Sequence, residues 1–455
     1  MAESYVPGEK SGAGVSSMRP THHTRACLSL LLFAAFNSAV HAADTATLAV
    51  MADTNEATAT AATTAEDFSY SGNWRTLLNA AQINSAGPAA LTGKLQPGLI
   101  TPVQTSVQSE LEMKAQYKNW HTTATLHTEK SDSNSARNTG WLNEFYGNLD
   151  LGAWQLSAGK KIIAWDVGYG FRPNDVIQQE KRRSLISQTA IGKPLASLDF
   201  FTADQALSLV WVNPAQNDAI NNIEEQAIAA RWYQRSGNAD WHAFARYGKH
   251  TQASLGAAFS WVASDAIELH GSLRVQQKAA ILQQTAFTGL ARSAPWQWAM
   301  QDQVSQLLLG ANLTTEDQQS FFVEYWYDGS ARSQSDWRQW LTQNQQLQSM
   351  GQQAPWRLAA AANLAWQNNA FNASSNLRRQ NLFARWSWQR DAWQTAIDLL
   401  WMPEDGGRIT TLSLEWQGDR WHWQAGLRVF NGPQQAIARQ LPNTHSAYVS
   451  ATWAF

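Results

Sequence analysis

Apolar and polar residues alternate at every second position along most of the chain after residue 67. The segment 420–430 shows the pattern clearly, because one parity is apolar and the other carries polar side chains or glycine. Its apolar set is Trp421, Trp423, Ala425, Leu427 and Val429. Segments 265–276 and 408–417 repeat the pattern. Alternation with a period of two is typical of β-strands that have one apolar and one polar face.

Runs of this kind predict about eighteen strands, within a range of about 16–18. They lie at 68–79, 106–117, 120–129, 141–151, 154–164, 195–202, 205–213, 225–235, 240–249, 253–263, 266–277, 303–314, 318–328, 379–389, 392–402, 408–417, 420–430 and 446–455. After residue 42 the sequence has no uninterrupted apolar run of roughly 18 residues, so it predicts no membrane-spanning helix.

The links between these strands alternate in length. The short links are 118–119, 152–153, 203–204, 236–239, 264–265, 315–317, 390–391 and 418–419. The intervening links are often long, at 80–105, 130–140, 165–194, 214–224, 278–302, 329–378 and 431–445. Short turns at one end and long loops at the other are typical of outer-membrane barrels, which also favour even strand numbers. The sequence therefore predicts an all-β fold, a single transmembrane antiparallel β-barrel with short periplasmic turns and long extracellular loops.

Tryptophan is unusually frequent, with 24 residues in a chain of 455. The tryptophans beside the short turns are Trp120, Trp154, Trp241, Trp388, Trp393, Trp416, Trp421 and Trp453. Those at the opposite strand ends are Trp141, Trp165, Trp211 and Trp401. Because indole rings favour the boundary between membrane and water, the sequence predicts two aromatic girdles.

The last predicted strand ends in the segment 448–455, in which aromatic and apolar positions alternate up to the final Phe455. This segment resembles the terminal strand of Gram-negative outer-membrane β-barrel proteins, a porin-like superfamily. The resemblance covers residues 68–455, and no motif assigns the chain to one porin family. It implies outer-membrane lipid as the surroundings and recognition by the barrel-assembly machinery, with Trp453 and Phe455 as the assembly signal.

Residues 1–42 have the layout of a secretory signal peptide. Arg19 and Arg25 precede an apolar run of about ten residues, and the small residues of Val40-His41-Ala42 follow it. Met18 is an alternative start. Cleavage after Ala42 would remove the only cysteine, so no disulfide is expected. The Ala- and Thr-rich stretch 43–67 predicts a flexible periplasmic leader, and 68–455 the barrel.

The predicted polar strand faces carry nine acidic and eight basic residues. They are Arg75, Glu110, Glu112, Lys114, Glu144, Asp150, Lys161, Asp199, Arg231, Arg246, Glu268, Arg274, Glu324, Arg385, Asp398, Glu415 and Arg428. Eighteen strands leave room for an aqueous lumen. Three of these residues, Arg246, Arg274 and Arg428, are candidates for solute binding. The alternative interpretation is a solvated wall of paired charges, and the near balance argues against strong ion selectivity.

The link 165–194 is the third outer loop, the one that folds inward in many porins, and it is our candidate constriction. Its candidate residues are Arg172, Asp175, Glu180, Lys181, Arg182 and Arg183. Bases outnumber acids in this loop, which favours anionic or polyhydroxylated solutes if it lies in the pore. A solvated surface loop is the alternative.

The link 329–378 is too long for a plain connector. Asp336 is a predicted N-cap of a helix that carries Trp337 and Trp340 and ends at Gly351, and Pro355 begins a second predicted helix. These helices would either cover the mouth of the barrel or pack on its outer rim.

The sequence contains no G-x-S-x-G, H-E-x-x-H, phosphate-loop or G-x-G-x-x-G motif, so no enzyme, cofactor or metal is predicted. A net charge of −2 argues against a nucleic-acid partner. These features predict a porin-like outer-membrane channel for a small polar or anionic solute. The alternative is a non-conducting structural or receptor barrel that binds a partner through its outer loops. The sequence leaves open the solute, the direction of transport and the oligomeric state.

Overall fold

The computed structural model describes residues 68–132, 134–177, 190–214, 225–285 and 289–455. The predicted signal peptide (1–42), the predicted leader (43–67) and the candidate residues Glu180, Lys181, Arg182 and Arg183 lie outside the described residues. Within the described part, no helix combines the length and apolar character needed to cross a membrane.

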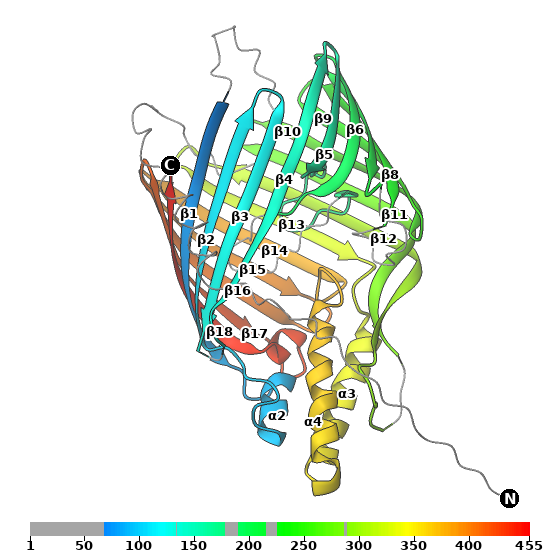
Figure 1. Cartoon of the computed structure of the whole chain (residues 1–455), viewed down its shortest axis with the longest axis vertical. Helices are drawn as coiled ribbons and strands as arrows, with labels where there is room; N and C mark the ends of the chain where they lie inside the picture. The colour runs from blue at the N-terminus through cyan, green and yellow to red at the C-terminus, as the bar shows by residue number, and fades with distance from the viewer. Residues whose placement is uncertain (1–67, 133, 178–189, 215–224, 286–288) are drawn as a thin grey trace, which may run out of the picture. The chain divides into compact units, whose positions relative to one another are not determined.

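Eighteen antiparallel strands form one closed barrel (Figure 1). The strands are β1 (Phe68–Ile83), β2 (Thr105–Tyr117), β3 (Trp120–Ser131), β4 (Arg137–Leu151), β5 (Trp154–Lys161), β6 (Lys193–Phe201), β7 (Gln205–Val212), β8 (Ala227–Ser236), β9 (Ala239–Gly248), β10 (Gln252–Ser264), β11 (Ile267–Gln284), β12 (Trp296–Thr314), β13 (Gln319–Asp328), β14 (Gln380–Arg390), β15 (Trp393–Met402), β16 (Gly407–Gln417), β17 (Trp421–Asn431) and β18 (Asn443–Ala454). Each strand pairs with the next along the chain, and β1 pairs with β18, which closes the ring. The predicted fold class is confirmed.

The two faces of the wall differ in the way the alternation predicts. On β11, Leu273 and Val275 expose about half of their surface outward, at 47% and 50%, whereas the intervening Arg274 and Gln276 are buried. The strand register places all the charged residues predicted to face inward on the lumen-side parity. An apolar outside and a polar inside are the reverse of a soluble fold and suit a barrel in lipid.

Two tryptophans depart from the predicted girdles. A β-bulge opposite Thr123 and Ala124 inserts Asn143 into β4 and reverses the parity beyond it. As a result, Trp141 points into the lumen, where its ring lies 5.9 Å from that of His127. Trp165 is 8% exposed in an interior cluster. The prediction that these two residues belong to a girdle is therefore wrong.

The hairpin of β11 and β12 is longer than predicted. Its pairing continues from Lys278 opposite Asp302 to Gln284 opposite Trp296. At its far end, Gln284 Nε2 donates to Gln343 Oε1 at 2.9 Å, so this part of the hairpin contacts a helix. Packing against protein in place of lipid removes the constraint that produces alternation, which explains why the pattern ends near residue 277.

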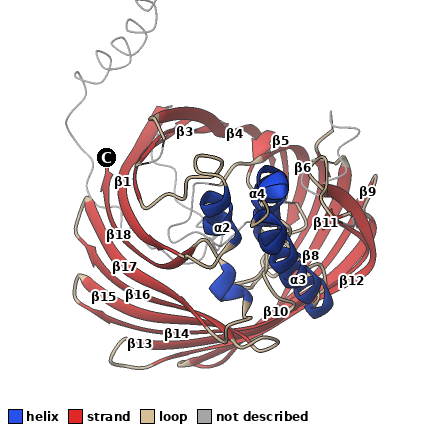
Figure 2. Cartoon of the chain, turned by 90° about the horizontal axis from the view of Figure 1, so that it is seen from below, coloured by secondary structure: helices blue, strands red, loops and turns tan. Residues whose placement is uncertain are grey.

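Three helices gather at the end of the barrel that has the long links. They are α2 (Pro88–Leu95), α3 (Gln334–Gly351) and α4 (Arg357–Gln367), with short 3₁₀ turns at Ala354–Trp356, Asn368–Asn372 and Ile437–Gln440. Leu95, Leu347 and Leu364 pack together where the helices meet. Figure 2 looks at this end and shows the helices across the ring of strands. Of the two predicted arrangements, the helices therefore adopt the one that covers the mouth.

The start of α3 corrects one detail. Ser333 is the N-cap, and its side chain accepts a hydrogen bond from the backbone N–H of Asp336. The Asp336 carboxylate in turn accepts the Ser333 N–H at 2.9 Å, which completes a capping box. Asp336 is thus the third helical residue, and the predicted N-cap is wrong by one turn.

Candidate functional site

Residues 162–177, the first part of the link between β5 and β6, lie inside the barrel. We call this segment the inner loop. Asn174 Nδ2 donates to Ser272 Oγ at 2.8 Å and to the Leu273 carbonyl at 3.1 Å, both on β11. On β10, a Cβ added to Gly256 would clash with Asn174 Oδ1, so only glycine leaves space for this amide. The predicted inward fold is thus observed for residues 162–177 of this link.

A second anchor joins the inner loop to β13. The carboxylate of Glu324 accepts the backbone N–H of Tyr169 at 2.7 Å and that of Gly170 at 2.6 Å. His270 Nε2, on β11, lies 3.0 Å from the same carboxylate. Glu324 is fully buried. Because these bonds involve a charged acceptor, they are stronger than bonds between neutral groups.

Two carboxylates brace the inner loop from within. Asp175 Oδ1 accepts the backbone N–H of Trp165 at 2.8 Å. Asp166 Oδ2 accepts the Asn174 N–H at 2.5 Å and the Ser272 hydroxyl at 2.9 Å. Burial raises the pKa of Asp166 to about 6, because the charged form is poorly solvated there. This carboxylate therefore titrates close to neutral pH.

Apolar contacts complete the docking of the inner loop. Phe171 packs on Leu308 and Trp326, with its ring 6.1 Å from the indole. Trp165 joins an interior cluster with Val210, among other residues. The other members of that cluster are Val176, Ile177, Leu195, Val212, Ala227, Ala229, Phe244 and Ala258. Several inward positions of β6 to β10 are therefore apolar because the loop, and not water, covers them.

Two of the candidate bases are covered as well. Arg274 is 1% exposed, and its Nη1 donates to the Pro173 carbonyl of the inner loop at 3.1 Å. Arg246 Nη2 lies 2.8 Å from Glu225 Oε1, and both side chains are buried. Neither guanidinium faces open lumen. Both hold the structure around the loop together.

The two candidates on the inner loop, Arg172 and Asp175, lie close to each other. Arg172 Nε donates to the Gly168 carbonyl at 2.7 Å, and Nη1 lies 3.8 Å from Asp175 Oδ2. Asp175 is buried, whereas the Arg172 side chain keeps 28% of its surface exposed. Arg172 is thus the loop base in the described part of the chain that a solute in the lumen could reach.

The wall formed by β14 to β18 carries charges that are paired across neighbouring strands. Arg385 Nη1 contacts both oxygens of Asp398, at 3.0 and 3.2 Å. His422 Nε2 lies 3.2 Å from Glu415 Oε2. The candidate Arg428 donates from Nε to Thr411 Oγ1 at 3.0 Å. The side chains of both acid–base pairs are partly exposed, between 14% and 21%, so the lumen meets a wall of accessible, paired charges.

No family model matches the chain, and no curated protein matches it. Solved structures do resemble it. Pseudomonas aeruginosa OccK11 is 11% identical, with 86% of this chain and 96% of that chain covered and a TM-score of 0.46. Salmonella typhi OmpF, in a complex with daunomycin, is 8% identical over 85% of this chain and 97% of that one, with a TM-score of 0.41. A mutant of the Rh. blastica porin is 10% identical over 85% and 100%, with a TM-score of 0.40.

These neighbours are bacterial outer-membrane porins.

Sequence reasoning missed the role of Glu324, which it placed among the wall acids without a contact to the loop. It also left Asn174 without a wall partner. One sequence signal was available. Leu195, Val210 and Phe244 are apolar residues at positions of the predicted strands where the alternation expects polar ones. Apolar side chains at lumen positions indicate that protein covers that stretch of wall.

Proposed function

We propose that the chain is an outer-membrane channel through which small polar solutes pass beside the inner loop. The observation that carries the proposal is the docking of residues 162–177 inside the ring, on β10 to β13. The loop occupies one side of the lumen, and the charged wall of β14 to β18 lies on another. A barrel with a polar wall and an apolar outside can hold water across a bilayer, and a loop inside it reduces the open cross-section.

The wall supports a polar solute more strongly than a charged one. Arg385 and Asp398 offer donors and acceptors side by side while nearly cancelling each other's charge. Strong ion selection needs a ring of charges of one sign. An anion preference, which we also propose, depends on Arg172 and on the bases Lys181, Arg182 and Arg183 of the same link. A reversal potential measured across a salt gradient tests this preference.

The helices at the mouth favour a second candidate function, a non-conducting receptor barrel. Trp337 and Trp340 are buried in one cluster with Met402, at the end of β15, and Ile437, in the β17–β18 link. A cover packed this firmly could carry a binding surface for an external partner. Conductance separates the two candidates, because a barrel closed by these helices passes no current.

The test is single-channel recording from the refolded mature chain, with heat-modifiable migration as proof of folding. We expect discrete conductance steps. The variant Phe171→Ala with Asn174→Ala loosens the inner loop and should raise the conductance. The control Asn148→Ala changes a lumen residue that bonds Ser157 and not the loop, and it should leave conductance unchanged. If the wild type, the double variant and the control all fold and none shows conductance steps, the channel proposal is wrong and the receptor is favoured.

A further inference from the structure

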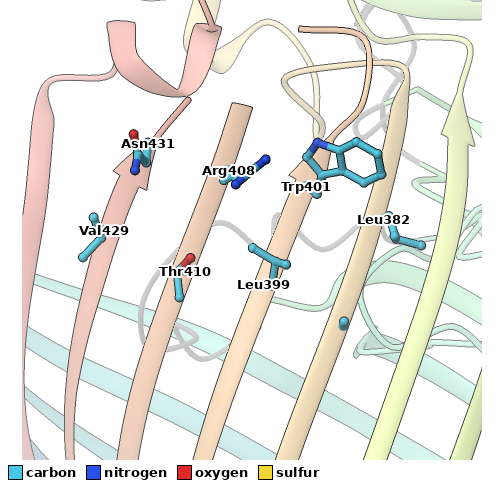
Figure 3. Close-up of a pocket in the computed structure, with 8 residues that line it drawn as sticks. Leu382, Leu399, Trp401, Arg408, Thr410, Val429 and Asn431 are labelled. Carbon is cyan, nitrogen blue, oxygen red and sulfur yellow. The ribbon is translucent and has the colours of Figure 1, made fainter. Parts of the chain in front are cut away.

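The outer wall of the barrel has a groove of about 450 Å³ on β14 to β17, near the end with the long links. Eight outward-facing residues line it, in two rows across the four strands. They are Leu382, Trp401, Arg408 and Asn431 in the row nearer the loops, and Ala384, Leu399, Thr410 and Val429 in the row below. Figure 3 shows Asn431, Arg408 and Trp401 above Val429, Thr410 and Leu399.

The lower row has the shape and polarity of a binding site for an alkyl chain. The small side chains of Ala384 and Thr410 alternate with the larger Leu399 and Val429, and this alternation leaves a depression between the larger side chains. Because the outward parity of the neighbouring strand positions is apolar, the depression continues into a hydrophobic surface. An alkyl chain lying in it would bury apolar area on both sides.

The upper row adds a cation to the groove. Arg408 is exposed on the outward face. Among the described residues, no ion pair involves Arg408. The nearest acids along the chain are Glu404 and Asp405, and they lie against Arg378, at 2.9 and 3.7 Å from its Nε. Because a different arginine holds these carboxylates, the charge of Arg408 remains available to a ligand outside the barrel.

The neighbours of Arg408 place its charge at the level of lipid headgroups. Trp401 is directly opposite Arg408 on β15, and Asn431 is opposite on β17. Indole rings favour the interface between headgroups and hydrocarbon. A guanidinium offers paired donors that match two oxygens of a phosphate, and the Asn431 amide adds a further donor.

We propose that this groove binds one phosphorylated lipid of the outer leaflet, with its phosphate on Arg408 and Asn431 and an acyl chain along Leu399 and Thr410. The proposal rests on the outer-membrane placement given above, and it does not depend on conduction. The charge of Arg408 and the apolar lower row together determine which ligand binds. A phosphate without an acyl chain makes no contact with the lower row, and a lipid without net negative charge gains little from Arg408.

The test is a titration of the refolded mature chain in detergent micelles with lipid A, followed by native mass spectrometry. Two variants change the groove: Arg408→Ser removes the cation, and Ala384→Phe fills the lower row from the outside, where the barrel interior is not disturbed. Arg408→Ser loses a charge-assisted contact and Ala384→Phe occupies the space of the acyl chain, so each should raise the Kd for lipid A roughly tenfold. The matched control is Arg390→Ser, an exposed arginine at the opposite end of β14, which should leave the Kd unchanged.

Three results would overturn the proposal. They are equal lipid A binding by Arg408→Ser and the wild type, equal binding of phosphatidylcholine and lipid A by the wild type, or displacement of lipid A by millimolar inorganic phosphate. Conductance of the same samples is recorded in parallel. Lipid binding without current would reject only the channel, and current without lipid A selectivity would reject only the groove.

Discussion

The carboxylate of Glu324 accepts the backbone N–H of Gly170 at 2.6 Å, and this bond joins residues that are 154 positions apart. It fixes the inner loop to the wall opposite the strands that it connects. The neighbouring N–H of Tyr169 bonds the other oxygen at 2.7 Å. A single buried side chain thus holds two consecutive amides, which is the geometry of a carboxylate clamp on a turn.

The first prediction concerns this clamp. In Glu324→Gln one carboxylate oxygen becomes an amide NH₂, which faces a backbone N–H and leaves it without an acceptor. Docking of the loop should weaken by about 1.5–3 kcal/mol. The expected result is a noisier open channel with more frequent steps to a higher conductance, measured in single-channel records. The control Glu415→Gln removes the same charge from the wall without touching the loop and should keep the wild-type noise. Equal noise in both variants would contradict the clamp.

The fold could be predicted because lipid and lumen impose the same alternation on every wall strand. The short strand β6 follows it from Ala196 to Phe200, whereas its inward Leu195 is apolar because the inner loop covers that position. The pattern fails where something other than lipid or water covers a strand. The bulge at Asn143 reverses the parity of Trp141. A pattern with a period of two does not predict where a bulge occurs.

The candidate site was less predictable, since its contacts join distant parts of the chain. The sequence placed Arg274 and Glu324 on the lumen wall, and the structure confirms that parity. It could not show that the loop covers Arg274 while Arg428 stays on another wall. Such a difference depends on where a loop docks, and periodicity carries no information about docking.

The second prediction concerns pH and the inner loop. Burial raises the pKa of Asp166 to about 6, above the 3.8 of an unperturbed carboxyl. The docked loop therefore binds a proton more tightly than the undocked loop does. It follows that docking becomes more stable as pH falls from 7 through 6 toward 4, by an amount on the order of 1–3 kcal/mol. The charges that face Asp166 are Asp175, which favours protonation, and Arg274, which opposes it.

Hydrogen exchange at the amides of Asn174 and Val167 measures this effect, because both N–H groups donate to Asp166. After correction for the intrinsic pH dependence, protection should increase from pH 7 to pH 5. The variant Asp166→Asn keeps an acceptor oxygen without a charge, so its protection should vary little over that range. Protection that falls with acid in the wild type would show that the sign is wrong.

The third prediction concerns topology. The short turns lie at the end of the barrel where the chain terminates, and α2, α3 and α4 lie at the other end (Figure 1). An epitope inserted at Gly418-Asp419 should be hidden from antibody on intact cells and become reactive after the outer membrane is permeabilised. An epitope between Gln352 and Gln353, in the link from α3 to the next helix, should react on intact cells. The opposite labelling would show that the barrel has the inverse orientation in the membrane.

The last prediction concerns Phe455, which closes the ring. Its backbone N–H donates to the Gly72 carbonyl at 3.0 Å, and its own carbonyl accepts the Gly72 N–H at 2.9 Å. Its ring lies over Gly72, where an added Cβ would come within 2.7 Å of the ring, and 5.0 Å from the ring of Trp453. Phe455 therefore completes the β1–β18 seam, and we propose that it has a second, separable role as an assembly signal, which the resemblance of the terminal strand implies.

Deleting Phe455 removes both roles, whereas Gly72→Leu disturbs the packing of β1 against Phe455 and against the backbone of β2 at Glu112 and leaves the terminal sequence intact. If Phe455 is an assembly signal, the deletion should sharply lower the amount of heat-modifiable barrel in outer-membrane fractions and leave fragments in the periplasm. Gly72→Leu should reach the membrane in larger amounts but unfold at a lower temperature, because the displaced ring loses its packing. Refolding into detergent micelles, where no assembly machinery acts, provides the control. There the deletion should fold nearly as well as the wild type, and a deletion that fails equally in micelles and in cells would assign Phe455 to the seam alone.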